Sequence, residues 1–230
     1  MIGTNAATLA FEHLRSDALV RFSLLALSSI FFLVDPFAAI GSFLAITAEA
    51  DEARRKRMAR KAAITCCIVL STFALAGQFI FRLFGITLPA FEIAGGLILL
   101  LIGLEMLQAK RSATQEASGD TEEASHKEDA GIVPLGIPML AGPGAISSVM
   151  VLVGQVPEIW HWQMGAILGA IVLTCLVSYW VLSAASRVQA FLGETGIRIL
   201  VRIMGLLLVA LACQFFVNGL TDLGLIAKTN

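Results

Sequence analysis

The stretch FLVDPFAAIGSFLAI, residues 32–46, places an acid and a proline side by side within an otherwise apolar segment. A proline inside a helix removes one backbone hydrogen bond and clashes with the carbonyl group four residues earlier. In a bilayer, an unsatisfied backbone group is costly, so such a break must face protein or a water-filled cavity. Asp35 and Pro36 therefore predict a transmembrane helix that is interrupted for a functional reason.

A second stretch, MLAGPGAISSVMVLV at residues 139–153, has the same form, with Gly142, Pro143 and Gly144 at its interruption. We expect Asp35 and Gly142 to be helix caps, with Pro36 and Pro143 as the first residues of the restarted helices. Each restart exposes free N–H groups and the positive end of a helix dipole, which suits an anion. Each preceding half ends in free carbonyl groups, which suit a cation or an ammonium group.

The composition places the whole chain in a membrane. Hydrophobic residues make up 57% of the chain and charged residues 14%, against roughly 25% charged in soluble domains. A net charge of −1 gives no indication of a nucleic-acid partner. A spanning helix needs about 20 mostly apolar residues. Six segments qualify, and they predict an all-α membrane protein: residues 22–47, 62–81, 86–107, 132–153, 162–185 and 199–226.

The basic residues predict the orientation of these spans. Lysines and arginines are concentrated after the first, third and fifth spans, which places those connections in the cytoplasm and both termini on the other side. We expect a polar extracytoplasmic lead at residues 1–21, a three-helix unit at 22–107, a cytoplasmic linker at 108–131 and a second three-helix unit at 132–226.

The two units resemble each other. A shift of 107 positions places Pro36 on Pro143, and DPFAAIGS on GPGAISSV. Because each unit holds three spans, the second must be upside down relative to the first. The sequence thus predicts two inverted-topology three-helix repeats, in which helices 1 and 4 are broken. Paired interruptions of this kind point to a transporter binding site.

The two breaks are expected to meet near the centre of the bilayer and to form one small site. A zwitterionic amino acid fits a site that presents N–H donors beside carbonyl acceptors, and so does an ion. Asp35 has two interpretations: it is the partner of a proton or a substrate ammonium group, or it only caps its own half-helix. The residues predicted to bind the substrate or ion are Asp35, Pro36, Ala38, Ala39, Gly41, Gly142, Pro143, Gly144 and Ser147.

Other classes of function find less support. The three histidines, His13, His126 and His161, lie in predicted loops or at span edges, which argues against an intramembrane serine protease. The sequence has no H-E-x-x-H zinc motif, and AGPGAIS has no lysine after it, as a P-loop would. We therefore expect neither an enzyme nor a bound cofactor or metal. A non-transporting membrane sensor or assembly factor remains the alternative to a transporter.

Two smaller features have structural interpretations. The four cysteines lie in apolar stretches without C-x-x-C spacing, and we interpret them as packing residues. Glu92, near the start of the third span, is expected to complement a helix N-terminus or to pair with Arg82.

The sequence resembles the MarC family, also called the SnatA-like family of small neutral amino acid transporters. The resemblance extends from about Leu24 to Leu223 and is carried by VPLGIPMLAGPGAISSVMVL, LPAFEIAGGLILLLIGLEML and RIMGLLLVALACQFFVNGL. In the first-half motif this chain has Ala38-Ala39-Ile40-Gly41, where the family has an amide and a second proline.

The resemblance implies a six-span protein of the bacterial inner membrane with both termini outside. It also implies transport of small neutral amino acids, of the glycine and alanine class, by alternating access with proton or cation coupling. The expected partners are that substrate and membrane lipid, and a homo-oligomer is compatible with the sequence.

Overall fold

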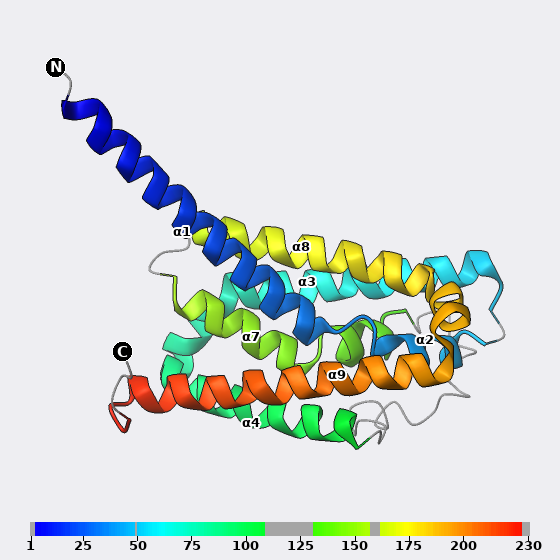
Figure 1. Ribbon diagram of the computed structural model, residues 1–230. Helices are drawn as coiled ribbons and strands as arrows, with labels where there is room; N and C mark the ends of the chain where they lie inside the picture. Colours follow the sequence, from blue (N-terminus) through cyan, green and yellow to red (C-terminus); the bar gives the residue numbers. More distant parts are fainter. Residues whose placement is uncertain (1–2, 49, 109–130, 157–161, 227–230) are drawn as a thin grey trace.

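The computed structural model describes residues 3–48, 50–108, 131–156 and 162–226, which contain helices and turns and no strand (Figure 1). The predicted linker lies almost entirely outside the described residues. The elements are α1 (Gly3–Val34), α2 (Ala39–Ile46), α3 (Glu52–Phe84), α4 (Leu88–Leu107), η1 (Leu135–Leu140), α7 (Pro143–Gly154), α8 (Trp162–Ser183) and α9 (Ala185–Asp222).

Four of the described helices are long and apolar enough to cross a bilayer: Glu52–Gly77, Leu88–Leu107, Trp162–Ser183 and Thr195–Asp222. A fifth span is formed if Leu19–Val34 and Ala39–Ile46, which meet at a bend of 44°, cross the membrane together. Helix α7 is apolar but shorter. The predicted class, an all-helical multi-pass membrane protein, is confirmed.

Caps set where the helices begin. Helix α3 starts at Glu52, earlier than the predicted Ala62, because the carboxylate of Asp51 accepts the N–H of Arg54 at 2.9 Å and so caps the polar first turns. Helix α4 starts at Leu88, where the hydroxyl of Thr87 accepts the N–H of Ala90. Helix α1 begins at Gly3, so the predicted polar lead is helical and continuous with the first span.

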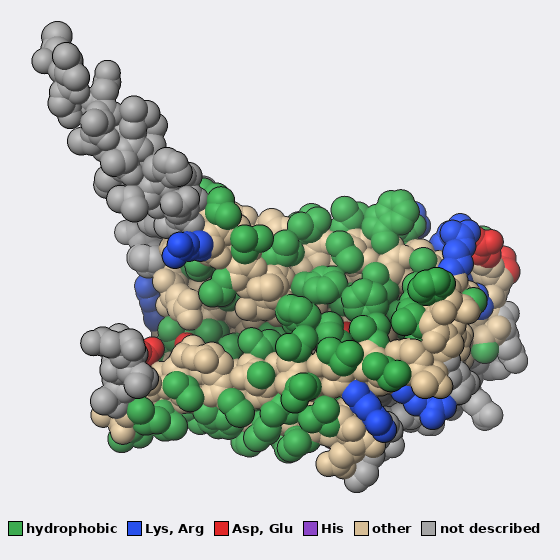
Figure 2. All heavy atoms as spheres, in the orientation of Figure 1, with side chains coloured by type: hydrophobic (Ala, Val, Ile, Leu, Met, Phe, Trp, Pro, Cys, Tyr) green, Lys and Arg blue, Asp and Glu red, His purple; other side chains and the backbone are tan. Residues whose placement is uncertain are grey.

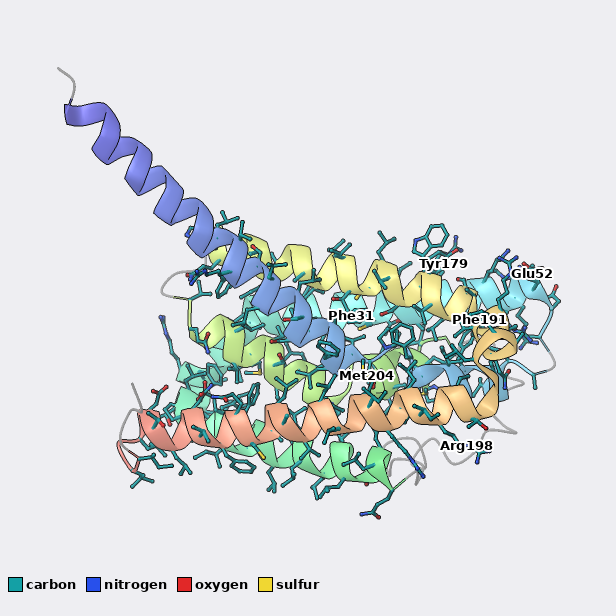
Figure 3. The ribbon with its side chains drawn as sticks, in the orientation of Figure 1. Phe31, Glu52, Tyr179, Phe191, Arg198 and Met204 are labelled. Carbon is teal, nitrogen blue, oxygen red and sulfur yellow. The ribbon has the colours of Figure 1, made fainter. Side chains whose placement is uncertain are left out.

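The connection between α8 and the last span is also helical. Helix α9 starts at Ala185 rather than at the predicted Ile199, and it is kinked at Gly193, whose φ of 65° and ψ of 175° suit glycine alone. The short stretch before the kink lies across the end of the molecule (Figure 1). It carries Phe191, which is 91% exposed and projects outward in Figure 3.

The helices form two layers that contact each other. One layer contains α1, α2, α3, η1, α7 and α8, and the other contains α4 and α9. Helices α3 and α8 pack together, and α1 packs against α8 and α7, while α4 and α9 form a separate pair (Figure 1). A large apolar core joins α1, α2, α3, η1, α7 and α8. A smaller core, with Leu99, Met204, Leu208 and Ala212, holds α4 to α9.

Glycines allow α4 and α9 to approach closely. A Cβ atom added to Gly96 would lie 3.0 Å from the carbonyl oxygen of Ala212, and one added to Gly103 would lie 2.9 Å from that of Gly205. At the other end of the pair, a Cβ added to Gly219 would lie 2.8 Å from the carbonyl oxygen of Pro89. These contacts show that α4 and α9 run antiparallel. Close backbone approach through small residues is the usual way in which membrane helices associate.

The first break lies where the two layers meet. Leu33 and Phe37, on either side of Asp35, pack against both the large core and the α4–α9 core. The fold therefore positions the interruption of the first helix between two bodies of packed helices, rather than at the lipid-facing surface.

Candidate functional site

The first break is a turn around Asp35. Helix α1 ends at Val34, Asp35 takes a left-handed conformation with φ of 41°, and α2 begins at Ala39. The prediction that Pro36 starts the second half-helix is wrong, because the left-handed residue ends α1 and residues 36–38 form a turn before the helix resumes. The carboxylate of Asp35 nevertheless accepts the N–H of Ala38 at 3.2 Å, as a cap would.

Only part of the Asp35 carboxylate is used in this way. The side chain is 7% exposed, and its Oδ2 has no hydrogen-bond partner among the described residues. A buried acceptor without a partner is destabilising by about 1–3 kcal/mol, and more when it is charged. The capping bond confirms the interpretation of Asp35 as a cap, and the interpretation as the partner of a proton or a substrate ammonium group stays a prediction.

The second break has the predicted capping geometry. Gly142 is the N-cap, with extended φ and ψ of −79° and 168°, and α7 begins at Pro143. No side chain caps this helix. The first amide groups of a helix have no intrahelical acceptor, and Pro143 has no N–H to offer. The donors at this helix end are therefore the N–H groups of Gly144 and Ala145, which are both buried residues.

The segment before the second break is less regular than a half-helix. In η1 the N–H groups of Ile137, Met139 and Ala141 each bond to a carbonyl five residues earlier, at 2.9–3.2 Å. We attribute this wide helix to Pro134 and Pro138, because each proline removes a donor and disfavours the ordinary helical bonds around it. The expectation of a regular half-helix over 132–141 is therefore corrected.

The fold brings the two breaks together. Helix α1 packs against α7, and α2 packs against η1, so each half of the first broken helix touches the opposite half of the second. A Cβ atom added to Gly144 would lie 3.8 Å from Cδ2 of Leu33, two residues before Asp35, and 2.8 Å from Cδ2 of Leu99 on α4. The N-terminus of α7 thus meets the end of α1 beside the α4–α9 pair.

The predicted site residues differ in where they lie. Pro36 and Ala39 are buried, Ala38 packs against the α4–α9 core, and Gly142 is half-buried. Ser147 is 5% exposed, and a Cβ atom added to Gly95 of α4 would lie 3.1 Å from the Cβ of Ser147.

Two of the predicted site residues face outward. Pro143 is exposed at the start of α7. Gly41 is exposed, and a Cβ atom added to it would meet nothing within 4 Å. Neither observation assigns these two residues a contact with the other break.

Aromatic side chains cover the first break. The ring of Phe31 packs edge-on against that of Phe37 across the turn, with centroids 6.2 Å apart, and against that of Phe32 at 6.0 Å. Figure 3 shows Phe31 near the end of α1 and Met204 on α9, the neighbouring helix in that view. Figure 2 shows a hollow between α1 and α9 with a small acidic patch at its floor.

Sequence reasoning missed several residues near the breaks and along the helices. Leu33, Phe37 and Leu99 form walls of the site, and only an apolar pattern marked them. Ser148 of α7 and Thr174 of α8 are buried, and their hydroxyl oxygens have no partner among the described residues. Their polarity within apolar spans was the available signal.

The cysteines also gather in a way that their spacing did not suggest. The thiol of Cys175 on α8 lies near the thiols of Cys66 and Cys67 on α3, close enough for hydrogen-bonding interactions, while Cys213 is exposed on α9. All four thiols are free. The cluster marks the contact between α3 and α8.

Comparison with known proteins agrees with this architecture. The family model described as "MarC family integral membrane protein" matches residues 20–223. A UPF0056 membrane protein of Methanocaldococcus jannaschii is 38% identical over 201 residues, which cover 87% of this chain and 97% of that protein.

Two bacterial relatives are similar over most of their length. The UPF0056 membrane protein YvbG of Bacillus subtilis is 35% identical over 195 residues, 84% of this chain and 90% of the relative. The UPF0056 membrane protein YhcE of Escherichia coli is 34% identical over 191 residues, 83% of this chain and 88% of the relative. No solved structure matches the chain significantly. The chain belongs to the MarC family of integral membrane proteins.

Proposed function

We propose that this protein is a secondary transporter that binds a small neutral amino acid, of the glycine and alanine class, between its two helix breaks. The observation that carries this proposal is the presence of one unsatisfied polar group at each of two breaks whose helices pack together. Asp35 presents a buried oxygen without a partner, and the uncapped N-terminus of α7 presents buried N–H groups. An ammonium group fits the first, and a carboxylate fits the second.

The size of the site favours a small substrate. Between the walls formed by Leu33, Phe37 and Leu99, the residues around the two breaks have small side chains or none: Ala38, Ala39, Gly144, Ala145 and Ser147. Leu99 and Leu33 already lie against Gly144, which leaves no room there for a long side chain. A hydrophobic wall of this kind discriminates against an extra methylene by about 1–3 kcal/mol.

We further propose that residues 22–107 and 132–226 are two repeats of opposite orientation, spanning a bacterial inner membrane with both termini outside. The antiparallel pairing of α4 with α9 supports this, as do the contacts of α1 with α7 and of α2 with η1. Most described basic side chains lie at one end of the molecule, at the start of α3 and the α8–α9 junction (Figure 2). That end is the cytoplasmic one in this proposal.

Alternating access then follows from the two layers. The break at Asp35 lies between the α4–α9 pair and the other helices. A small rotation of one layer against the other opens the site to one side of the membrane or the other, as in transporters built from repeats. The energy comes from an ion gradient.

Counterflow in proteoliposomes tests the function. Vesicles containing the purified protein are loaded with unlabelled alanine, and uptake of labelled alanine or glycine is measured. We expect transient accumulation with the wild type, and a loss of at least about tenfold for Gly144→Val, whose side chain would occupy the space taken by Leu99.

Gly41→Ala is the matched control, because it changes an exposed glycine of the other broken helix, where an added methyl group meets nothing within 4 Å. It should retain wild-type counterflow. Absence of counterflow with every small neutral amino acid tested would reject the transport function and favour a non-transporting sensor or assembly factor.

A further inference from the structure

A second buried carboxylate lies away from the breaks. Glu92 on α4 is 2% exposed, and its Oε2 has no hydrogen-bond partner among the described residues. The other residues on the buried face of α4 are three glycines, Leu99 and Met106. Glu92 is therefore the one ionisable group on the described buried face of this helix, and an unmatched charge there is costly.

Side chains from two other helices face Glu92. The side chain of Gln155, directly after α7, lies within reach to donate a hydrogen bond to the Glu92 carboxylate. Asp222, the last residue of α9, is near enough for its negative charge to act on Glu92, and it is exposed. The described part of α7 carries no ionisable side chain, and the described arginines of α9 lie toward its other end.

Contacts on both sides of Glu92 fix its position along α4. Gly95, one turn along α4, packs against Ser147 of α7, and Leu88, one turn in the other direction, packs against Gly154. Glu92 thus faces α7 between the second break and the end of that helix. At about 1.5 Å per residue it is roughly 10 Å along α4 from Leu99, which contacts Gly144 at the break.

Helix ends add to the negative potential. Helices α7 and α9 both finish here, and the C-terminal end of a helix carries a partial negative charge. The first turn of α4 supplies the opposite partial charge, beside Glu92 itself. The positive charge of Arg82, in the last turn of α3, also lies at this end of the molecule. Two carboxylates and two helix C-termini still outweigh one arginine and one helix N-terminus, which leaves a net attraction for a cation.

We propose that Glu92, Gln155 and Asp222 form a binding site for one monovalent cation, a proton or a sodium ion. Asp222 at the surface attracts the cation, Gln155 holds one oxygen of Glu92, and the free Oε2 receives the positive charge. This inference rests on the proposed transport function, for which it names the site of the coupling ion, at the extracytoplasmic end of the molecule.

The experiment uses purified full-length protein in nanodiscs with no amino acid present. In one arm, infrared difference spectroscopy follows the C=O stretch of protonated carboxyl groups as the pH is varied across the neutral range. In the other arm, the Tm is measured while sodium chloride replaces choline chloride at constant pH and ionic strength. The first arm detects a proton and the second a sodium ion.

We expect the wild type to respond in one arm, and Glu92→Gln to lose the part of that response that persists in Asp35→Asn, the variant without the other buried carboxyl group. Glu105→Gln is the matched control, since it makes the same change at the other end of α4, and it should respond as the wild type does. Asp222→Asn, a change at an exposed residue, should weaken binding several-fold, seen as a midpoint at lower pH or at higher sodium concentration.

A response that is the same in Glu92→Gln as in the wild type, or a wild type that responds in neither arm, would overturn the proposal. If Glu92→Gln does not fold, the test is the midpoint, in pH or in sodium concentration, of Asp222→Asn. A midpoint equal to that of the wild type counts against the site. A cation response without amino acid counterflow would reject the transport function and leave the site intact, so the two failures are distinguishable.

Discussion

Asp35 combines a structural and a chemical role in one side chain. Its left-handed backbone ends α1, its first carboxylate oxygen caps the following turn through Ala38, and its second oxygen is buried without a partner. Asparagine and aspartate tolerate the left-handed conformation better than most residues. This explains how a single acid can both end the helix and place a carboxyl oxygen at the break.

Substitutions at Asp35 separate these two roles. Asp35→Asn keeps an acceptor for the N–H of Ala38 and suits the backbone conformation, so we expect its free energy of unfolding to change by less than about 1 kcal/mol. Asp35→Ala removes the cap and strains the backbone, and should cost about 0.5–2 kcal/mol or more. Thermal melts check both values.

In contrast to stability, the affinity for the substrate should be lost in both Asp35→Asn and Asp35→Ala. Both variants lose the partner of the substrate ammonium group, so alanine should no longer raise the Tm of either protein. An alanine-dependent rise in Tm that persists in Asp35→Asn would show that the carboxylate is only a cap.

At the scale of elements, the α4–α9 pair depends on glycine. Because the added Cβ of Gly103→Ala would lie 2.8 Å from Cγ2 of Val209 and 2.9 Å from the carbonyl oxygen of Gly205, the two helices must separate to admit it. We expect a loss of about 1–3 kcal/mol in stability, measured as a lower Tm in detergent.

Gly169→Ala on α8 is the matched control for this change. Its added methyl group meets nothing within 4 Å, so it should leave stability unchanged or raise it by up to about 1 kcal/mol, since alanine favours helix. Equal effects of the two substitutions would contradict the close packing of α4 on α9.

Whether the sequence predicts a helix end depends on which interaction sets that end. Proline and glycine chemistry is local, so the N-cap at Gly142 and the start of α7 at Pro143 could be predicted from the sequence. The turn after Asp35 could not, because a left-handed residue at a helix end competes with the Asp-Pro capping pattern and prevails. In the same way, Pro134 and Pro138 acted together to widen η1, which no single-residue rule anticipates.

For the candidate site, the sequence predicted the location of the two breaks but not the residues that surround them. Polar and proline residues inside apolar spans marked the two breaks, but the partners of Glu92 come from the ends of helices distant in the sequence. The outward orientation of Gly41 depends on the exact length of the turn before it. Such details arise from tertiary packing, which periodicity and spacing do not encode.

For the whole molecule, the account requires that α3 and α8 move as one body while the α4–α9 pair moves against them. The cluster of Cys175 with Cys66 and Cys67 lies inside the first body. Oxidation with oxygen and copper-phenanthroline should therefore form a disulfide between Cys175 and one of the other two, removing two alkylatable thiols without stopping counterflow.

Two observations check this prediction. Cys175→Ser should retain every remaining thiol after the same treatment, while Cys213, exposed on α9, should stay reactive in both proteins. Arrest of counterflow by the disulfide in the wild type would show that α3 and α8 move relative to each other, against the two-layer account.

Whether the two helix breaks bind one zwitterion can be seen in a cryo-electron microscopy or crystal structure determined with saturating alanine. We expect density for the ammonium group within hydrogen-bonding distance of Oδ2 of Asp35, and for the carboxylate against the N–H groups of Gly144 and Ala145. A structure in which the alanine binds elsewhere, or in which α1 continues unbroken through Asp35, would contradict it.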